Sequence, residues 1–142
     1  MKEMSRRSFL KAGTAATAAL ALSPSDLLAK AKASKKAPTG KIKLLGVGVG
    51  GRGHADINGV TYKGKGEVYD DIEFIGMCDV DFKYAKGVLD EYKKLFPNMK
   101  IYNDYKKMYA ELLDQADAVI CGTADHTHAI ICAEALAAGK HV

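Results

Sequence analysis

The residues at positions 48–53, Gly-Val-Gly-Gly-Arg-Gly, follow an apolar run over residues 42–47. A buried strand that turns through such a cluster into a helix points backbone N–H groups at the helix N-terminus, where they can bind phosphate. Two registers of the Gly-x-Gly-x-x-Gly pattern fit, with glycines at 46/48/51 or at 48/50/53. We favour the second, because Gly46 lies inside the apolar run whereas Gly48 lies where the strand must turn.

In the favoured register each glycine has its own role. Gly48 makes the turn, Gly50 lets a pyrophosphate approach the backbone, and Gly53 lets the helix pack on the strand. A glycine-rich turn that binds no ligand is the alternative. The first candidates for cofactor binding are therefore Gly48, Val49, Gly50, Gly51, Arg52 and Gly53.

A carboxylate, Asp79, follows a second apolar run over residues 72–78, and it lies 26 residues beyond Gly53. A carboxylate in this place can accept hydrogen bonds from both hydroxyls of an adenosine ribose. Its charge repels a 2′-phosphate, which favours NAD over NADP. Arg52 could meet a phosphate or stack on adenine, so NADP stays open. The alternative role of Asp79 is to cap the next helix, although Asp81 is better placed for that cap.

A third polar segment, Thr123 to His128, follows the apolar run at residues 116–122. In a doubly wound sheet the end of this strand faces the bound cofactor. Within this segment the candidates for cofactor binding are Thr123, Ala124, His126 and His128.

The same segment carries atoms that can bind a metal, in Asp125, His126, His128 and Cys132. His126 and His128 point in different directions on a helix, however, and the sequence offers no further ligand beside them. We therefore predict no metal site.

Strand and helix patterns alternate along the rest of the chain. The spacing of apolar residues, with Pro97, Asp104 and Gly139 as boundary signals, predicts parallel strands joined by helices. This alternation indicates an α/β fold with a Rossmann-type doubly wound sheet. We expect strands at 41–47, 72–78, 100–102 and 116–122, helices from 52 to about 58, at 81–95, from 105 to 113 and at 126–138, and the start of a fifth strand at 140–142.

Three motifs in order resemble those of the Gfo/Idh/MocA oxidoreductases, which include glucose–fructose oxidoreductase and inositol dehydrogenase. These motifs are GVGGRGH, then MCDVD, then ICGTADHTHAIICAEALAAGKHV, and the resemblance spans residues 41–142. The family usually has Thr-Pro where this chain has Thr123-Ala124. The resemblance implies that His128 borders the nicotinamide or substrate pocket.

The family pattern continues beyond this point with a Glu-Lys-Pro segment, whose lysine lies in the active site, and with a substrate-binding α/β domain. The resemblance therefore implies a chain truncated before the second domain, with no catalytic residue of its own. The end of the chain within an expected strand favours the same interpretation.

The N-terminus contains paired arginines, Arg6 and Arg7, before Phe-Leu-Lys and the mildly apolar run AGTAATAALAL. This pattern resembles a twin-arginine export signal, and the run of about a dozen residues is too short to span a bilayer. Ala-x-Ala triplets allow cleavage after residue 21, 31 or 33. We predict a signal peptide at 1–33, a linker at 34–40 and an incomplete NAD(P)-binding Rossmann domain at 41–142.

The net charge of +4 lies in residues 1–33, and the remainder of the chain is balanced. The basic character therefore belongs to the signal and not to a nucleic-acid-binding surface. The three cysteines are expected to be buried small residues, because strands 72–78 and 116–122 flank the first strand and hold Cys78 too far from Cys121 for a disulfide.

The resemblance and the signal together imply an exported, for instance periplasmic, NAD- or NADP-dependent oxidoreductase of a sugar or polyol, with the twin-arginine machinery as a partner and a homo-oligomer when full length. One alternative is an NAD-dependent glycosidase that oxidises its substrate transiently. Another is a nucleotide-binding module without catalytic activity.

Overall fold

The computed structural model describes residues 40–142, so the signal and nearly all of the linker lie outside the described residues. Four parallel strands form one sheet in the order β3-β2-β1-β4. The strands are β1 (Ile42–Val47), β2 (Ile72–Cys78), β3 (Lys100–Tyr102) and β4 (Ala118–Cys121).

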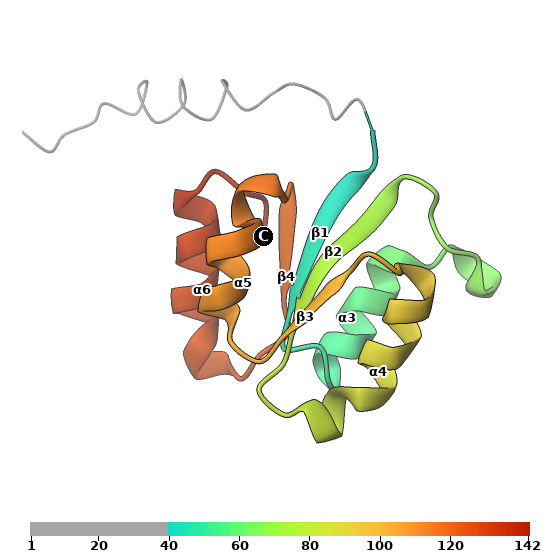
Figure 1. Ribbon diagram of the computed structural model, residues 1–142, viewed down its shortest axis with the longest axis horizontal. Coiled ribbons are helices and arrows are strands. Elements are labelled where there is room, and N and C mark those ends of the chain that lie inside the picture. The colour runs from blue at the N-terminus through green and yellow to red at the C-terminus, as the bar shows by residue number, and fades with distance from the viewer. Residues whose placement is uncertain (1–39) are drawn as a thin grey trace, which may run out of the picture. The chain divides into compact units, whose positions relative to one another are not determined.

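Two helices cover each face of the sheet (Figure 1). One face carries α3 (Arg52–Thr61) and α4 (Phe82–Leu95), and the other carries α5 (Tyr105–Leu112) and α6 (Asp125–Ala137). The short 3₁₀ turns are η1 (Gly64–Gly66) and η2 (Leu113–Gln115). The chain runs outward from β1 to β3 and then returns to the other side of β1, which confirms the doubly wound α/β sheet expected from the sequence.

Local side-chain chemistry sets several helix boundaries as predicted. The Asp81 carboxylate accepts a hydrogen bond of 2.9 Å from the Tyr84 N–H and caps α4. Asp104 accepts one of 2.9 Å from the Lys106 N–H and caps α5. After α6, Gly139 adopts a φ of 76°, the left-handed conformation that commonly follows a helix end.

Other boundaries differ from the prediction. β4 begins at Ala118 and not at 116, because the Ala116 N–H still bonds the carbonyl of Leu112 at the end of the preceding helical turns. α3 extends to Thr61, whose hydroxyl donates to the Ile57 carbonyl at 2.7 Å. The expected fifth strand is a single parallel bridge between Ala118 and His141.

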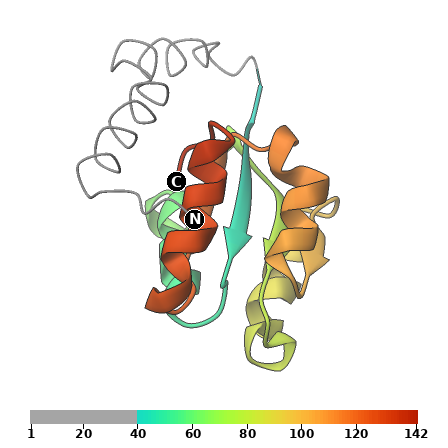
Figure 2. The ribbon, with the colours of Figure 1, turned by 90° about the vertical axis from the view of Figure 1, so that its left-hand side faces the viewer.

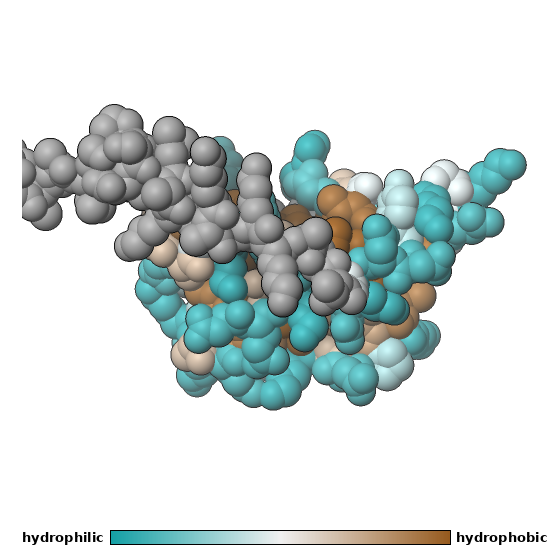
Figure 3. All heavy atoms as spheres, turned by 90° about the horizontal axis from the view of Figure 1, so that it is seen from above, coloured by the Kyte–Doolittle hydropathy of each residue, from teal (hydrophilic) through white to brown (hydrophobic). Residues whose placement is uncertain are grey.

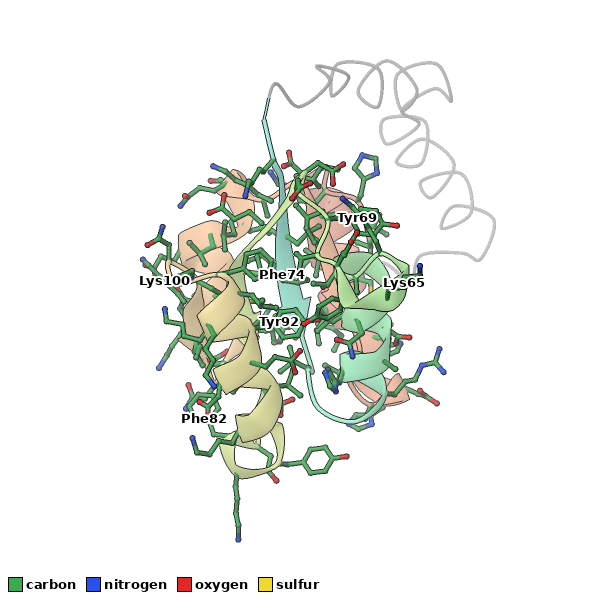
Figure 4. All side chains as sticks on the ribbon, turned by 90° about the vertical axis from the view of Figure 1, so that its right-hand side faces the viewer. Lys65, Tyr69, Phe74, Phe82, Tyr92 and Lys100 are labelled. Atoms are coloured by element: carbon green, nitrogen blue, oxygen red, sulfur yellow. The ribbon has the colours of Figure 1, made fainter. Side chains whose placement is uncertain are left out.

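The core has two parts, one on each face of the sheet. Beneath α3 and α4 it includes a group of aromatic residues: the ring centroids of Phe74 and Tyr92 lie 5.4 Å apart in an edge-to-face arrangement, and Phe96 packs beside them. Figure 4 labels Phe74 and Tyr92 in this part of the core. Beneath α5 and α6 it is largely aliphatic, with Leu45 and Val119 among its members. Because the sheet is covered on both faces, β1 is apolar over most of its length.

The three cysteines are free thiols, and only Cys78 is buried. Cys121 and Cys132 are partly exposed, so the expectation that all three are buried is wrong for these two. Cys121 and Cys78 pair with opposite sides of Val47, which places a strand between them as predicted.

Figure 3 views the molecule from the side where the strands begin. The strands run away from that side, and at the far end β1 leads into α3 (Figure 2). The surface visible in Figure 3 is mainly hydrophilic, with a few hydrophobic residues between. None of the helices in residues 40–142 combines the length and apolar character needed to cross a membrane.

Candidate nucleotide-binding site

A cavity of about 480 Å³ opens at the carboxyl ends of β1, β2 and β4. Its walls come from the segments that follow these strands, so residues distant in the sequence meet there. From the first two strands the cavity is lined by Val47, Gly48, Gly50, Cys78, Asp79 and Val80. This position is the switch point of the sheet, where open α/β folds bind their ligands.

The glycine turn packs against the β4 end at Gly48. The φ of Gly48 is +71°, and a Cβ there would lie 2.6–2.7 Å from atoms of Thr123. The Gly48 N–H donates to the Cys78 carbonyl at 2.8 Å, which ties the turn to β2. Only glycine combines this conformation with so close an approach.

Gly53 and Gly122 pack backbone against backbone. A Cβ on Gly53 would overlap the carbonyl oxygen of Gly48, and one on Gly122 would overlap the Cα of Gly53. A Cβ on Gly46 would meet only side-chain atoms, at 3.2–3.5 Å. These contacts agree with the 48/50/53 register. Sequence reasoning missed Gly122, although a glycine directly after an apolar strand was a visible signal.

The space above Gly50 differs from the expectation. A Cβ there would lie 2.7 and 2.8 Å from the Cδ1 and Cε1 atoms of Tyr84, so an aromatic ring lies where the sequence predicted only the approach of a pyrophosphate.

Asp79 is 9% exposed and binds the backbone of the glycine turn. Its Oδ2 accepts hydrogen bonds from the N–H groups of Val49 (2.9 Å) and Gly50 (3.0 Å), and its Oδ1 accepts one from Asp81 (2.9 Å). The N–H groups of Val49 and Gly50, which we expected to bind phosphate, thus point at the Asp79 carboxylate instead. A carboxylate oxygen can accept two hydrogen bonds, so Oδ1 keeps capacity for one ribose hydroxyl.

The N-terminus of α3 supplies the remaining donors of the turn. Gly51 precedes the first helical residue, Arg52, and N–H groups in this position have no partner within the helix. The Arg52 side chain is 84% exposed and its Nε pairs with Asp56 at 2.9 Å. Neither Gly51 nor Arg52 is among the described residues that line the cavity.

The opposite wall is the segment after β4. Thr123, Ala124, His126 and Thr127 line the cavity. The Thr127 hydroxyl lies 2.8 Å from the Thr123 hydroxyl and 2.8 Å from the Ala124 carbonyl. Ala124 has φ −67° and ψ 145°, the conformation that proline would take, so the turn keeps its shape without the proline of the resembled family.

His128 lies next to this wall but is not among the described residues that line the cavity. Its Nε2 is 2.7 Å from the Thr123 carbonyl oxygen. His126, in the first turn of α6, lines the cavity. Across residues 40–142, no three His, Cys, Asp or Glu side chains gather closely enough to hold a metal ion.

The apolar part of the wall contains residues that the sequence did not single out. Tyr105 and Ile131 contribute side chains from α5 and α6. Cys78 lies beside Asp79, and burial, together with the charges of Asp79 and Asp104, raises the pKa of its thiol to about 12. The Cys78 thiol is therefore protonated at neutral pH and acts as an apolar surface of the cavity.

Comparison with known proteins gives one family match and a set of similar structures. Residues 3–23 match the twin-arginine translocation pathway signal sequence, which confirms the signal predicted from the paired arginines. No curated protein sequence matches the chain.

Three similar solved structures are dehydrogenases. WlbA dehydrogenase from Chromobacterium violaceum, in complex with NADH and UDP-GlcNAcA, is 26% identical with a TM-score of 0.58 over 75% of this chain and 27% of its own. Myo-inositol dehydrogenase from Lactobacillus casei, in complex with NAD(H) and myo-inositol, is 23% identical with a TM-score of 0.55 over 70% of this chain and 26% of its own. Apo scyllo-inositol dehydrogenase from the same organism is 24% identical with a TM-score of 0.51 over 72% of this chain and 27% of its own.

The chain thus spans about a quarter of the length of these structures. The matches confirm the Rossmann-type fold and the resemblance to the Gfo/Idh/MocA oxidoreductases.

Proposed function

We propose that this chain is the dinucleotide-binding part of an exported NAD-dependent oxidoreductase that acts on a sugar or polyol. The observation that carries the proposal is the cavity at the sheet's switch point, where the glycine turn and the Asp79 carboxylate meet the Thr123 segment. The similar structures supply the substrate class, since one holds myo-inositol and another a nucleotide sugar.

In this proposal the free N–H groups of Gly51 and Arg52 face the pyrophosphate, because the α3 N-terminus favours negative charge. Asp79 holds the adenosine ribose through Oδ1, and Thr123 with Ala124 forms the wall on the nicotinamide side. The bound NAD supplies the hydride acceptor. We assign no acid or base step to any residue of this chain. The organisation that fits is a signal at 1–33, a linker at 34–40 and a nucleotide-binding domain at 41–142.

The charges of the cavity favour NAD over NADP. A 2′-phosphate placed at the ribose would meet the carboxylate of Asp79, which lines the cavity. Among the described residues that line the cavity, none is a lysine or arginine, so no cation compensates that repulsion.

Titration of NAD and NADP into the full chain by calorimetry tests the proposal. We expect NAD to bind at least about tenfold more tightly than NADP, and Asp79→Ala to weaken NAD binding by about tenfold or more. Asp90→Asn is the matched control, because Asp90 is an exposed α4 carboxylate paired with Lys86. A folded wild-type chain that binds neither nucleotide would contradict the proposal.

Export adds a second requirement. Dinucleotides are made in the cytoplasm and the twin-arginine route carries folded proteins, so we propose that the cofactor is loaded before export and retained. Nucleotide analysis of the exported protein after gel filtration tests this, and a protein stripped of nucleotide by that step argues against retention. The assembly proposed for the longer protein is a homo-oligomer.

A further inference from the structure

Tyr84 lies in the first turn of α4 and extends over the glycine turn. Its N–H is held by the Asp81 cap at 2.9 Å, which fixes the start of the side chain. Its Cδ1 and Cε1 atoms lie 2.7 and 2.8 Å from the point where a Cβ on Gly50 would stand. Its hydroxyl oxygen lies 2.9 Å from the corresponding point on Gly51. The ring therefore runs along the turn from one glycine to the next.

Core packing does not explain this position. The buried residues of α4 are Ala85, Leu89 and Tyr92, whereas Tyr84 is 69% exposed. Its ring lies against the glycine turn, and the residue lines the cavity. An exposed aromatic ring at the rim of a concave site is a typical ligand-contacting feature.

The Asp79 carboxylate lies on the same side of the turn. Its Oδ2 is 3.5 Å from the Cβ position of Gly50, the point that the Tyr84 ring also approaches. The ring thus stands next to the hydrogen bonds that Asp79 accepts from Val49 and Gly50. Hydrogen bonds to a charged group are stronger where water is excluded.

We infer that Tyr84 is a positioning residue whose ring covers the Asp79–glycine contact and slows release of the bound dinucleotide. This inference rests on the proposed function, which supplies the ligand. The ring has to leave room for the nucleotide at Gly50, and its high exposure means that few contacts oppose a small rotation. In this inference the apolar ring of Tyr84, and not its hydroxyl, keeps water away from the hydrogen bonds between Asp79 and the glycine turn.

The release rate of NADH from the full chain, followed by stopped-flow fluorescence after displacement with excess NAD, tests the inference. We expect Tyr84→Ala to release NADH about tenfold faster and Tyr84→Phe to stay within about twofold of the wild type. Phe82→Ala is the matched control, because Phe82 is a partly exposed aromatic residue of the same helical turn and does not belong to the described cavity wall (Figure 4). Equal effects of the Ala and Phe variants at position 84 would overturn the role of the ring.

A second measurement needs no nucleotide. Amide hydrogen exchange, followed by NMR, reports the protection of the Val49 and Gly50 N–H groups in the free chain. We expect Tyr84→Ala, and neither Tyr84→Phe nor Phe82→Ala, to speed exchange at Gly50. Unchanged exchange and unchanged release in Tyr84→Ala would overturn the inference and leave the proposed function standing. Failure of the wild type to bind NADH would instead contradict the proposed function, and the exchange data alone would then decide whether Tyr84 covers the turn.

Discussion

The two faces of the sheet are built from different chemistry. Beneath α3 and α4, aromatic rings are joined by polar bonds between the helices: the buried Tyr92 hydroxyl lies 2.7 Å from Asn58 Oδ1 and 3.1 Å from Thr61 Oγ1. Beneath α5 and α6, Tyr109 is also buried, but its hydroxyl has one longer bond, 3.3 Å to the Ile131 carbonyl.

The outer surfaces of the two faces differ as well. α4 presents charged residues to solvent, including the Lys86–Asp90 pair. α6 instead leaves the side chains of Ile130 and Leu136 58% and 60% exposed. The outer side of α6 is therefore more apolar than that of a usual surface helix, although its Glu134 accepts a hydrogen bond from Lys106 of α5. Buried polar bonds thus contribute more on the α3–α4 face, and burial of apolar groups contributes more on the α5–α6 face.

The cavity lies at the ends of the strands, between the segments that lead to the helices of the two faces. Its two walls are also held by different kinds of contact. On one side the glycine turn and Asp79 are fixed by backbone contacts. On the other side the Thr123 segment is held by side-chain hydroxyls and one histidine ring. We therefore expect substitutions at the first wall to cost much more than substitutions at the second.

Gly53→Ala gives the largest expected effect. The added methyl group would overlap the Gly48 carbonyl, and Gly48 in turn packs against Thr123. We expect a loss of about 3 kcal/mol or more in the free energy of unfolding, and a fall in melting temperature of more than about 10 °C. Calorimetric melting measures both.

Gly59→Ala is the control for that change, because Gly59 lies in the same helix with open space at its Cβ position. Alanine there should stabilise the chain by about 0.5–1 kcal/mol. A Gly53→Ala variant as stable as the wild type would show that the glycine contact does not fix the first wall.

The thiol of Cys78, which belongs to the core beneath α5 and α6 and also lines the cavity, tests whether burial suppresses its reactivity. A pKa of about 12 leaves only about one thiol in ten thousand ionised at pH 8, so alkylation by iodoacetamide should be about a thousandfold slower than in the unfolded chain. Because the pKa is raised, the rate should climb with pH toward 12. Mass spectrometry of each cysteine gives the rates, with the chain in guanidinium as the reference. Rapid labelling of Cys78 in the folded chain would mean that burial does not suppress ionisation of the thiol.

Removal of one hydroxyl from each face compares the two faces directly. Tyr92→Phe deprives both Asn58 and Thr61 of a buried partner, and we expect a cost of about 1–2 kcal/mol. Tyr109→Phe loses a single long bond to a carbonyl and should cost about 0.5 kcal/mol. Urea denaturation of both variants measures the difference, and equal costs would remove the contrast between directional and apolar packing.

Local patterns in the sequence predicted the fold in detail. The bounds of β2 and β3, and the caps at Asp81 and Asp104, are confirmed because turn residues and apolar spacing act over a few neighbours. β4 was predicted too long, since the helical turn that ends at Ala116 competes with the strand for the same residues.

The contacts within the candidate site were harder to predict. Asp79 was identified, but its partners Val49 and Gly50 lie 30 and 29 residues away in the sequence. The place of Tyr84 above Gly50 depends on how α4 meets the glycine turn, and the role of Gly122 depends on where β4 ends against α3. These contacts follow from tertiary packing, so periodicity and motif spacing do not predict the partners; the position of Gly122 directly after an apolar run marks the residue but not what it contacts.

Thr127 allows the finest comparison, since the polar contacts of its side chain with the second wall all come from one hydroxyl. Thr127→Ala removes the hydroxyl bonds to Thr123 and Ala124, and partial exposure of the site lets water replace them. We expect a loss of about 0.5–1 kcal/mol in unfolding free energy and a change of about twofold to threefold in NAD affinity. Thr127→Ser keeps the hydroxyl and should behave as the wild type in both titrations. If Thr127→Ala costs as much as Gly53→Ala, the second wall is as rigidly specified as the first, and side-chain hydroxyls then fix a turn as firmly as packed backbone.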